Sequence, residues 1–367
     1  MSFNDHKMIP ETQTAIIADI AGDLVVSYNV LVPELLPDML LIKTAAVALN
    51  PVDTKFTGPL ASEGAIAGGD CAGVVVAIGS GVPKGRFSIG DRVCAAVSFM
   101  DPLSPQIGAF AEYVGATADF TLKLPDGMPF EVGATLGISF ATVGYALFRS
   151  LQIPGHSEKP AVQPAYVLIY GGSSATGTMA IQLVKRSGLI PLTTCSPKHN
   201  HLVEGYGAAK TFDYHDPSSA NEIREYTKND LWYALDCICE ESSMQFCYAA
   251  LGRAGGRYTT LLPYPQHLHT RKRVKPEWLL APALLGRRIG WPAPYNIEGD
   301  YELRVFGREW FLCAQQLLQT GKIRPHPMRL GEGTGFPAVL QGLDLLKRKI
   351  VSGEKLVYTI THDSLYH

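Results

Sequence analysis

The chain has 367 residues, of which 46% are hydrophobic and 18% are charged, and its formal net charge is −2. This length is typical of two domains rather than one. The near-neutral charge gives no electrostatic reason to expect nucleic acid as a partner, and no run of about eighteen apolar residues predicts a membrane span.

The cysteines are odd in number, scattered, and form no C-x-x-C pair, which is typical of buried free thiols in a reducing compartment. The N-terminal stretch MSFNDHKMIPETQ is polar and shows no secretory signal. The expected location is therefore cytoplasmic. The seven cysteines are at positions 71, 94, 195, 237, 239, 247 and 313.

The first third of the chain, from Gln13 to about Leu124, reads as strands. TAIIADIAGDLVVSY, MLLIKTAAVAL and AGVVVAIGSGV are β-rich and are separated by Gly, Pro and Asp. A mostly β domain is expected here. Near Phe130 the pattern changes to helical spacing in FEVGATLGISFATVGYALF, and the Pro-rich LQIPGHSEKPAVQP then predicts a surface connection.

The next part alternates apolar runs with amphipathic segments. The predicted strands are AYVLIY, LIPLTTC, TFDY, LWYALDCI and RYTTLL, with helices from Thr176 to Ser187 and near Asn200 to Tyr206 among them. This alternation predicts an α/β fold with a Rossmann-type doubly wound parallel sheet, buried on both faces. The tail LDLLKRKIVSGEKLVYTIT predicts one more helix and a strand that can return to the first domain.

A glycine turn follows the strand Tyr166 to Tyr170. Gly171 and Gly172 form the predicted turn, and Gly177 stands where the helix must approach the strand closely. Ser174 occupies the middle position of G-x-G-x-x-G, which a serine can fill if its φ is negative, its hydroxyl then adding a donor. The segment alone leaves two interpretations open: a dinucleotide site, or a structural strand-turn-helix with no ligand.

The end of the second predicted strand indicates which cofactor would bind. An NAD site commonly has an acidic residue there, whereas LTTCSPKHN supplies Thr194, Ser196 and Lys198 and no carboxylate. This composition favours NADPH over NADH. The alternative for Lys198 is an ordinary surface charge, so the missing acid is the stronger half of the argument.

Motifs along the whole chain resemble one superfamily. VALNPVDTKFTG, GGDCAGVVVAIGSGV, IGDRV, GAFAEY, the glycine turn and SGEKLV are similar, in order and spacing, to the zinc-free quinone-reductase-like branch of the medium-chain dehydrogenase/reductases. YGGSSATGTMAIQL, TCSPKHN, TFDYHDP and WPAPY resemble more narrowly the trans-acting enoyl reductases of fungal iterative polyketide synthases. The resemblance implies a GroES-like substrate and catalytic domain over 1–135, completed by about 325–367, and a Rossmann NADPH-binding domain over 136–324.

The resemblance also allows a test for zinc. The positions that correspond to the catalytic zinc ligands of other members are Asn50, Gly69 and Ile138, and Asp70 replaces the glutamate of the GHE motif. None of the three is a thiolate or an imidazole, and the region from Val97 to Gly108 lacks the four cysteines of a structural zinc lobe. No metal is therefore expected.

The family pattern assigns candidate site residues. Lys55 is the candidate for a functional polar group in the cleft, with ion pairing to Asp53 or to the cofactor phosphates as an equally weighted alternative, and Thr142 is expected to begin a substrate-lining helix. The implied cofactor contacts are Pro51, Val52, Asp53 and Thr54; Ser173, Ser174, Ala175 and Thr176 at the diphosphate; Ser196, Pro197, Lys198 and His199 at the 2′-phosphate; Tyr214 at the adenosine; and Leu261, Leu262, Val351 and Ser352 at the nicotinamide half. The implied substrate contacts are Thr142, Val143, Gly144, Tyr145, Ala146, Leu147, Phe148 and Arg149, with Pro282, Ala283, Leu284, Leu285 and Gly286 as a wall of the acyl pocket. Without the family, core packing of a helix is the favoured interpretation of any one residue of Pro282 to Gly286.

The resemblance implies an NADPH-dependent reductase of enoyl thioesters carried by the acyl carrier protein of a polyketide synthase. The basic residues Arg287, Arg288 and Arg271 to Lys275 could steer that acidic partner, although a solvated loop is the simpler interpretation. A free-standing quinone or enone reductase and a non-reducing accessory protein remain as alternatives. RYTTLL is expected to be the edge strand of the nucleotide domain, and the prolines of LLPYPQ would block its pairing, which favours a monomer.

Overall fold

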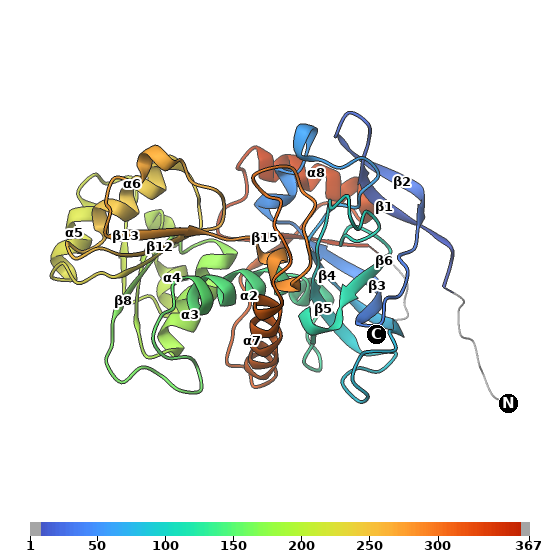
Figure 1. Cartoon of the computed structure of the whole chain (residues 1–367), viewed down its shortest axis with the longest axis horizontal. Helices are drawn as coiled ribbons and strands as arrows, with labels where there is room; N and C mark the ends of the chain where they lie inside the picture. The colour runs from blue at the N-terminus through green and yellow to red at the C-terminus, as the bar shows by residue number, and fades with distance from the viewer. Residues whose placement is uncertain (1–8, 361–367) are drawn as a thin grey trace.

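Two large sheets organise residues 9–360, the part of the chain that the computed structural model describes. Figure 1 shows them as two lobes, with β3–β6 and β15 in one and β8, β12 and β13 in the other. The first lobe has strands β1 (Thr12–Ala18), β2 (Leu24–Leu31), β3 (Met39–Ala48), β4 (Asp70–Ile78), β5 (Arg92–Ala96), β6 (Tyr113–Thr117), β7 (Thr121–Lys123), β14 (Met328–Leu330) and β15 (Lys355–Thr359). Its main sheet has the order β14-β15-β3-β4-β5-β7, with β6 also on β3, while β1 and β2 form a separate antiparallel pair.

The second lobe is the predicted parallel sheet. Its strands are β8 (Tyr166–Tyr170), β9 (Ile190–Thr194), β10 (Lys210–Phe212), β11 (Tyr233–Asp236), β12 (Gly256–Thr260) and β13 (Val274–Trp278), in the order β10-β9-β8-β11-β12-β13. All neighbours are parallel. Helices α3 (Ala175–Arg186), α4 (Asn200–Tyr206), α5 (Ser219–Tyr226) and α6 (Glu241–Ala250) connect the strands, which confirms the predicted α/β architecture. The direction of winding reverses between β8 and β11, and ligands of such sheets bind outside the carboxyl ends of the strands at that point.

The remaining helices pack on the first lobe or between the two lobes. They are α1 (Phe130–Gly133), α2 (Gly137–Gly144) with its π-helical extension η4 (Tyr145–Ser150), α7 (Tyr301–Gln319) and α8 (Gly335–Lys347). Helix α2 packs against both α3 and α7, and α2 and α7 occupy the middle of Figure 1. Within residues 9–360 the stretch Phe130–Ser150 is long and apolar enough to cross a membrane, but 78% of its apolar window is buried, as in the core helix of a folded protein.

Residues 279–299 form an arm that runs from the end of β13 back to the first lobe. The arm begins with η7 (Ala281–Leu285), and its Trp291 Nε1 donates to the carbonyl of Phe99 at 2.9 Å. The Trp291 ring lies 4.0 Å from the Phe56 ring, centroid to centroid. Burial of these aromatic rings ties the arm to the first lobe. The other short helices are η1 (Pro51–Thr54), η2 (Gly58–Leu60), η3 (Ala118–Phe120), η5 (Pro197–His199) and η6 (Gln266–Leu268).

The predicted edge strand is wrong. RYTTLL forms β12, which lies between β11 and β13, so the edge of the described sheet is β13. The sequence VKPEW was missed because a proline in a five-residue run argues against a strand. Leu279 N donates to Thr260 O, and residues of a strand alternate between its two sides. The nitrogen of Pro276 therefore lies on the open side, where its missing N–H removes no bond from the sheet.

A second correction concerns Thr142. It does not begin a helix, because α2 starts at Gly137 and ends at Gly144. Thr142 lies two residues before that end, with only 6% of its surface exposed. The helix starts earlier because the Ile138 N–H at its N-terminus is satisfied by the Asp70 carboxylate at 2.7 Å, from a strand that is distant in sequence.

Candidate cofactor and substrate site

The turn between β8 and α3 has the geometry of a close-approach site. Gly171 has φ +83°, a left-handed conformation that favours glycine. A Cβ on Gly172 would lie 1.8 Å from Thr193 Oγ1, and one on Gly177 would lie 2.5 Å from the Gly171 carbonyl oxygen. Each glycine is therefore required by contacts inside the turn. The segment Ser173 to Thr176 is half-buried at the N-terminus of α3, where the first N–H groups of a helix lack partners within it.

Ser174 is the N-cap of α3. Its φ is −81°, its hydroxyl oxygen accepts from Gly177 N at 3.0 Å, and its hydroxyl donates to the Gly171 carbonyl at 2.8 Å. The negative φ that a serine needs at this position is present. The serine thus closes the turn and caps the helix. Its negative φ is one that any residue can adopt, so the position does not require a glycine.

The residues predicted at the 2′-phosphate follow the neighbouring strand β9. Lys198 is exposed, and Ser196 and His199 are half-buried. His199 Nε2 lies 2.9 Å from Ser352 Oγ, which joins the two lobes. Ser352, assigned to the nicotinamide half, therefore lies beside a residue assigned to the 2′-phosphate. Burial first, and then the charge of Lys198, lower the pKa of His199, so its ring is neutral near pH 7.

Tyr214 and Leu261 flank the same edge of the sheet. The exposed Tyr214 ring lies 6.2 Å, centroid to centroid, from Tyr170, the residue immediately before the glycine turn. This position fits its predicted contact with an adenosine. Leu261 N donates to Cys239 Sγ at 3.2 Å, and Leu262 and Val351 are half-buried. Cys239 has φ +64° and follows Asp236, whose buried carboxylate accepts from Cys239 N at 3.0 Å.

Lys55 acts electrostatically on the other lobe. It is exposed, and its charge acts to lower the pKa of Cys239 in the other lobe, although burial outweighs this effect and raises that pKa to about 12. The predicted alternative of a Lys55–Asp53 ion pair is not seen among the described residues, because Asp53 is buried and its Oδ2 accepts from Asn50 N at 2.7 Å. Of the other η1 residues, Pro51 is exposed, and Val52 and Thr54 are half-buried.

The three positions examined for zinc meet around a buried ion pair. Asp70 Oδ2 accepts from Lys355 Nζ at 2.6 Å and from Asn50 Nδ2 at 2.9 Å, and Asp70 Oδ1 accepts from Ile138 N. A Cβ on Gly69 would lie 3.2 Å from the Ile138 side chain. The space is therefore filled by an ammonium group, an amide and a hydrocarbon. These donors do not fit a zinc ion, and residues 9–360 contain no cluster of three His, Cys, Asp or Glu that could hold a metal.

Asp53 is a second buried carboxyl group beside this ion pair. Its exposed fraction is 2%, and its Oδ1 has no hydrogen-bond partner. Burial, opposed by the Asn50 backbone N–H and reinforced by the charge of Asp70, raises the pKa of Asp53 to about 7. The group therefore titrates in the physiological range although it lies in the core.

An apolar pocket lies where β5, α2 and η7 meet. The cavity that its lining leaves measures about 10 Å³. Of the residues predicted for the acyl wall, Pro282 and Leu285 line this pocket, whereas Ala283 and Leu284 are buried behind them and Gly286 ends η7. Sequence reasoning missed the other lining residues, because they come from four separate segments: Ala96, Val97, Ser98, Phe120, Ile138, Ala141 and Ala281.

Residues 143–149, predicted as substrate contacts, are not among the lining residues of this pocket. Val143, Ala146 and Leu147 have 0% exposed surface and belong to the core. A Cβ on Gly144 would lie 2.0 Å from Trp310 Nε1, and the Phe148 ring lies 5.1 Å from the Trp310 ring. These residues pack α2 and η4 against α7. Tyr145 is half-buried and Arg149 is exposed. The residues of helix α2 that line the pocket are Ile138 and Ala141, which come earlier in the helix.

The basic residues are partly structural. Arg271 donates to the carbonyls of Tyr248 and Leu251 at 2.6 and 2.9 Å and so satisfies the C-terminus of α6. Arg287 pairs with Asp38 at 2.7 Å, and Arg288 with Glu298 at 3.4 Å. Arg271 and Arg287 thus have structural partners, whereas Lys272, Arg273 and Lys275 are exposed, as a solvated segment would be.

The fold and the site together define a medium-chain dehydrogenase/reductase. The alcohol dehydrogenase GroES-like domain matches residues 36–126. The structure is similar to that of an alcohol dehydrogenase superfamily protein from Novosphingobium aromaticivorans, with TM-score 0.75, 22% identity, and coverage of 95% of this chain and 100% of that one. It is also similar to the CurK enoyl reductase, with TM-score 0.72, 17% identity, and coverage of 96% and 100%. At these identities the likeness shows the fold alone.

Curated relatives are much closer in sequence. The chain is 52% identical to the trans-enoyl reductase FSL5 of Gibberella zeae over 96% of its own length and 98% of that protein. It is 48% identical to the trans-enoyl reductase eqxC of Fusarium heterosporum over 96% and 100%, and 49% identical to buaC of Petromyces alliaceus over 96% and 98%. The chain belongs to the trans-enoyl reductase family, as its motifs predict.

Proposed function

We propose that the protein is an NADPH-dependent enoyl reductase that acts in trans on polyketide intermediates bound to an acyl carrier protein of a synthase. The observation that carries this proposal is that α2, which lines the apolar pocket, packs against α3, the helix that follows the glycine turn. A strand-turn-helix built for a diphosphate stands at the switch point of one sheet, and an apolar pocket opens between β5, α2 and η7.

Support for NADPH comes from the chemistry after β9. A 2′-phosphate carries negative charge, and Lys198 with Ser196 offers a cation and a hydroxyl where an NAD site would have a carboxylate. His199, being neutral near pH 7, would act as a hydrogen-bond donor or acceptor rather than as a charge. The diphosphate would meet the half-buried backbone of Ser173 to Thr176.

The reaction is a conjugate reduction. When bound, NADPH would supply a hydride for the β-carbon of an enoyl thioester, the thioester carbonyl would take up the displaced π electrons, and the α-carbon would take its proton from water. The zinc positions hold an Asp70–Lys355 ion pair and hydrocarbon, so the chain's own contribution is alignment of the two reactants. Lys55, an exposed residue of the first lobe, is the candidate for a positive charge near the developing enolate.

The test follows NADPH consumption by absorbance, with a crotonyl thioester offered first on pantetheine and then on a carrier protein. Oxidation with the carrier-bound thioester supports the proposal. Turnover of a simple quinone without turnover of either thioester would instead assign the protein to free-standing quinone reduction. Binding of NADPH without turnover of any of these substrates would leave a non-reducing accessory role.

Cofactor choice is tested with Lys198→Gln. Loss of the lysine charge should raise the KM for NADPH at least about tenfold, because a charge-assisted hydrogen bond is stronger than a neutral one, and should leave the KM for NADH unchanged. Lys84→Gln is the matched control, since Lys84 is an exposed lysine of the first lobe. An equal effect of both variants on NADPH would contradict the assignment of Lys198.

A further inference from the structure

Two segments that line the apolar pocket share a single arginine as hydrogen-bond partner. Phe120 supplies one wall from η3 of the first lobe, and Leu285 supplies another from η7 at the start of the arm. Arg304, on α7, donates through Nη2 to Asp119 Oδ2 at 3.3 Å and through Nη1 to the Leu285 carbonyl at 3.5 Å. Its partners are thus the residue before Phe120 and the backbone of Leu285 itself.

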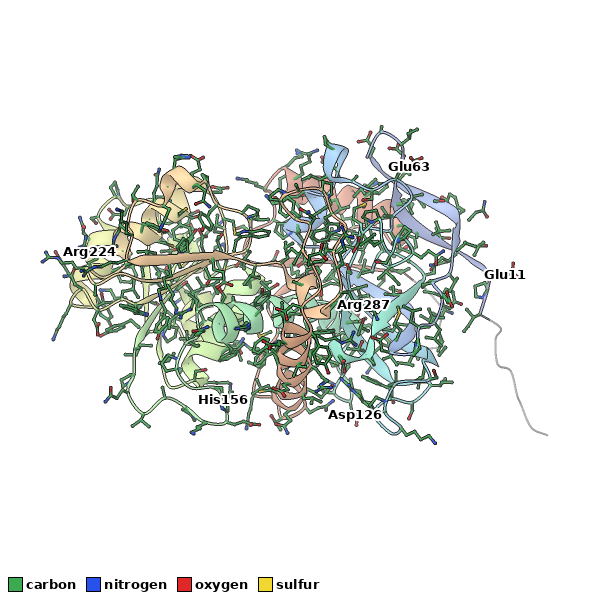
Figure 2. All side chains as sticks on the ribbon, in the orientation of Figure 1. Glu11, Glu63, Asp126, His156, Arg224 and Arg287 are labelled. Carbon is green, nitrogen blue, oxygen red and sulfur yellow. The ribbon has the colours of Figure 1, made fainter. Side chains whose placement is uncertain are left out.

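Arg304 is one member of a larger ion-pair network. Its Nη2 also donates to Asp38 Oδ2 at 2.6 Å, and Arg287 Nη2 donates to both oxygens of Asp38 at 2.7 and 2.8 Å. Arg86 Nη1 donates to Asp119 Oδ1 at 2.7 Å. Figure 2 shows Arg287 in the middle of the molecule, beside the helix α7 that carries Arg304. The two aspartates come from the first lobe, whereas Arg287 and Arg304 come from the arm and from α7.

The network is partly shielded from solvent. The exposed fractions of the Arg304 and Asp119 side chains are 22% and 17%. Burial alone would raise the pKa of Asp38, but the guanidinium groups of Arg304 and Arg287 outweigh it and lower that pKa. The two guanidinium groups therefore stabilise the ionised carboxylate of Asp38. Being shielded, they are weakened less by salt than fully exposed pairs.

The backbone around Arg304 leaves little freedom. Gly286, between Leu285 and Arg287, has φ +66°, and a Cβ there would lie 2.5 Å from Arg304 Cβ. A Cβ on Gly307, one turn along α7, would lie 2.7 Å from Phe120 Cε1. Helix α7 thus approaches the arm closely at Gly286 and approaches Phe120 closely at Gly307. The Arg304 side chain contacts both segments from the same helix.

We propose that Arg304 is a positioning residue that fixes the width of the acyl pocket by linking the Phe120 and Leu285 walls, and that it thereby sets which acyl chains are accepted. This inference rests on the proposed function. Arg304 does not need to touch the reacting carbons, because its partners are Asp38, Asp119 and the Leu285 carbonyl. The group recognised is the apolar part of the acyl chain beyond the enoyl carbons.

The test compares Arg304→Gln with the wild type on a series of enoyl pantetheine thioesters, from butenoyl to decenoyl and including a methyl-branched member. The KM should change by less than about twofold for butenoyl and by about tenfold or more for the longest or branched chains, since one methylene in an apolar pocket changes discrimination on this scale. The kcat for butenoyl should be retained. Arg304→Lys keeps the charge but cannot hold both carboxylates, and should restore part of the selectivity.

The matched control is Arg308→Gln, an exposed arginine one turn further along α7, which should leave the profile unchanged. Asp119→Asn removes the same link from the other side, and it provides a second variant should Arg304→Gln fold poorly. An Arg304→Gln loss that is the same for every acyl chain, or no loss at all, would overturn the proposal. Failure of the wild type to reduce any thioester would instead refute the proposed function.

Discussion

Lys355 Nζ lies 2.6 Å from Asp70 Oδ2, and the exposed fractions of the two side chains are 3% and 0%. The pair joins β15, near the C-terminus, to β4, in the same sheet with β3 between them. It also occupies the place where other members of the superfamily are expected to bind zinc. A side-chain ammonium thus provides the positive charge next to Asp70, and the carboxylate retains further donors from Asn50 and Ile138.

Removal of Lys355 should destabilise the protein strongly. Lys355→Met leaves Asp70 buried without a counter-charge, and breaking a buried pair from one side typically costs about 3–5 kcal/mol. Urea denaturation monitored by circular dichroism measures this loss. The double variant Lys355→Met with Asp70→Asn should recover much of the stability, because no uncompensated charge remains. Equal stability of the single variant and the wild type would show that the pair is not a structural element.

Asp53 predicts a dependence of stability on pH. Its folded pKa of about 7 lies above the usual value of 3.8, so the folded state holds this proton more tightly than the unfolded chain. The free energy of unfolding should therefore fall as pH rises from about 4 to about 7, and this loss should persist above pH 7. The neighbouring charged groups are Asp70 and Lys355, which lie 2.6 Å apart as an ion pair.

The measurement compares the wild type with Asp53→Asn by urea denaturation at about pH 5 and about pH 8. The asparagine keeps an oxygen for the Asn50 N–H but cannot ionise, so this part of the pH dependence should disappear. The variant should gain stability relative to the wild type at the higher pH. A difference between the two proteins that is the same at both pH values would contradict the raised pKa.

Two substitutions of Ser174 can distinguish its role as a helix cap from its predicted role at the diphosphate. Ser174→Ala removes the acceptor of Gly177 N and should cost about 1 kcal/mol of stability. Ser174→Asp restores a cap, and its negative charge suits a helix N-terminus, so stability should return. The same charge should repel the cofactor diphosphate and raise the Kd for NADPH more than about tenfold. Fluorescence titration measures this Kd, and tight binding by Ser174→Asp would place the diphosphate elsewhere.

The extent of sequence prediction can be read from particular residues. The β8–turn–α3 unit was predictable because strand, turn and helix are consecutive, and Gly171, Gly172 and Gly177 meet local steric demands. The pocket was not, because Phe120, Ile138 and Leu285 come from distant segments and each resembles an ordinary core residue. Lys355 gave no signal of its own either, since a lysine before LVYT is common in a strand and its partner lies 285 residues away.

Pro276 in the edge strand β13 is expected to limit self-association of the protein through that edge. Pro276 occupies the centre of the strand and turns its nitrogen to the open side, where an N–H would otherwise pair with another chain. Pro276→Val should therefore add a donor to an exposed edge and increase self-association at high protein concentration, as measured by light scattering after size-exclusion chromatography. Pro263→Val, in the loop after β12, is the control and should leave the mass unchanged. If Pro263→Val associates and Pro276→Val does not, the loop prolines protect the sheet, as the sequence pattern had indicated for RYTTLL.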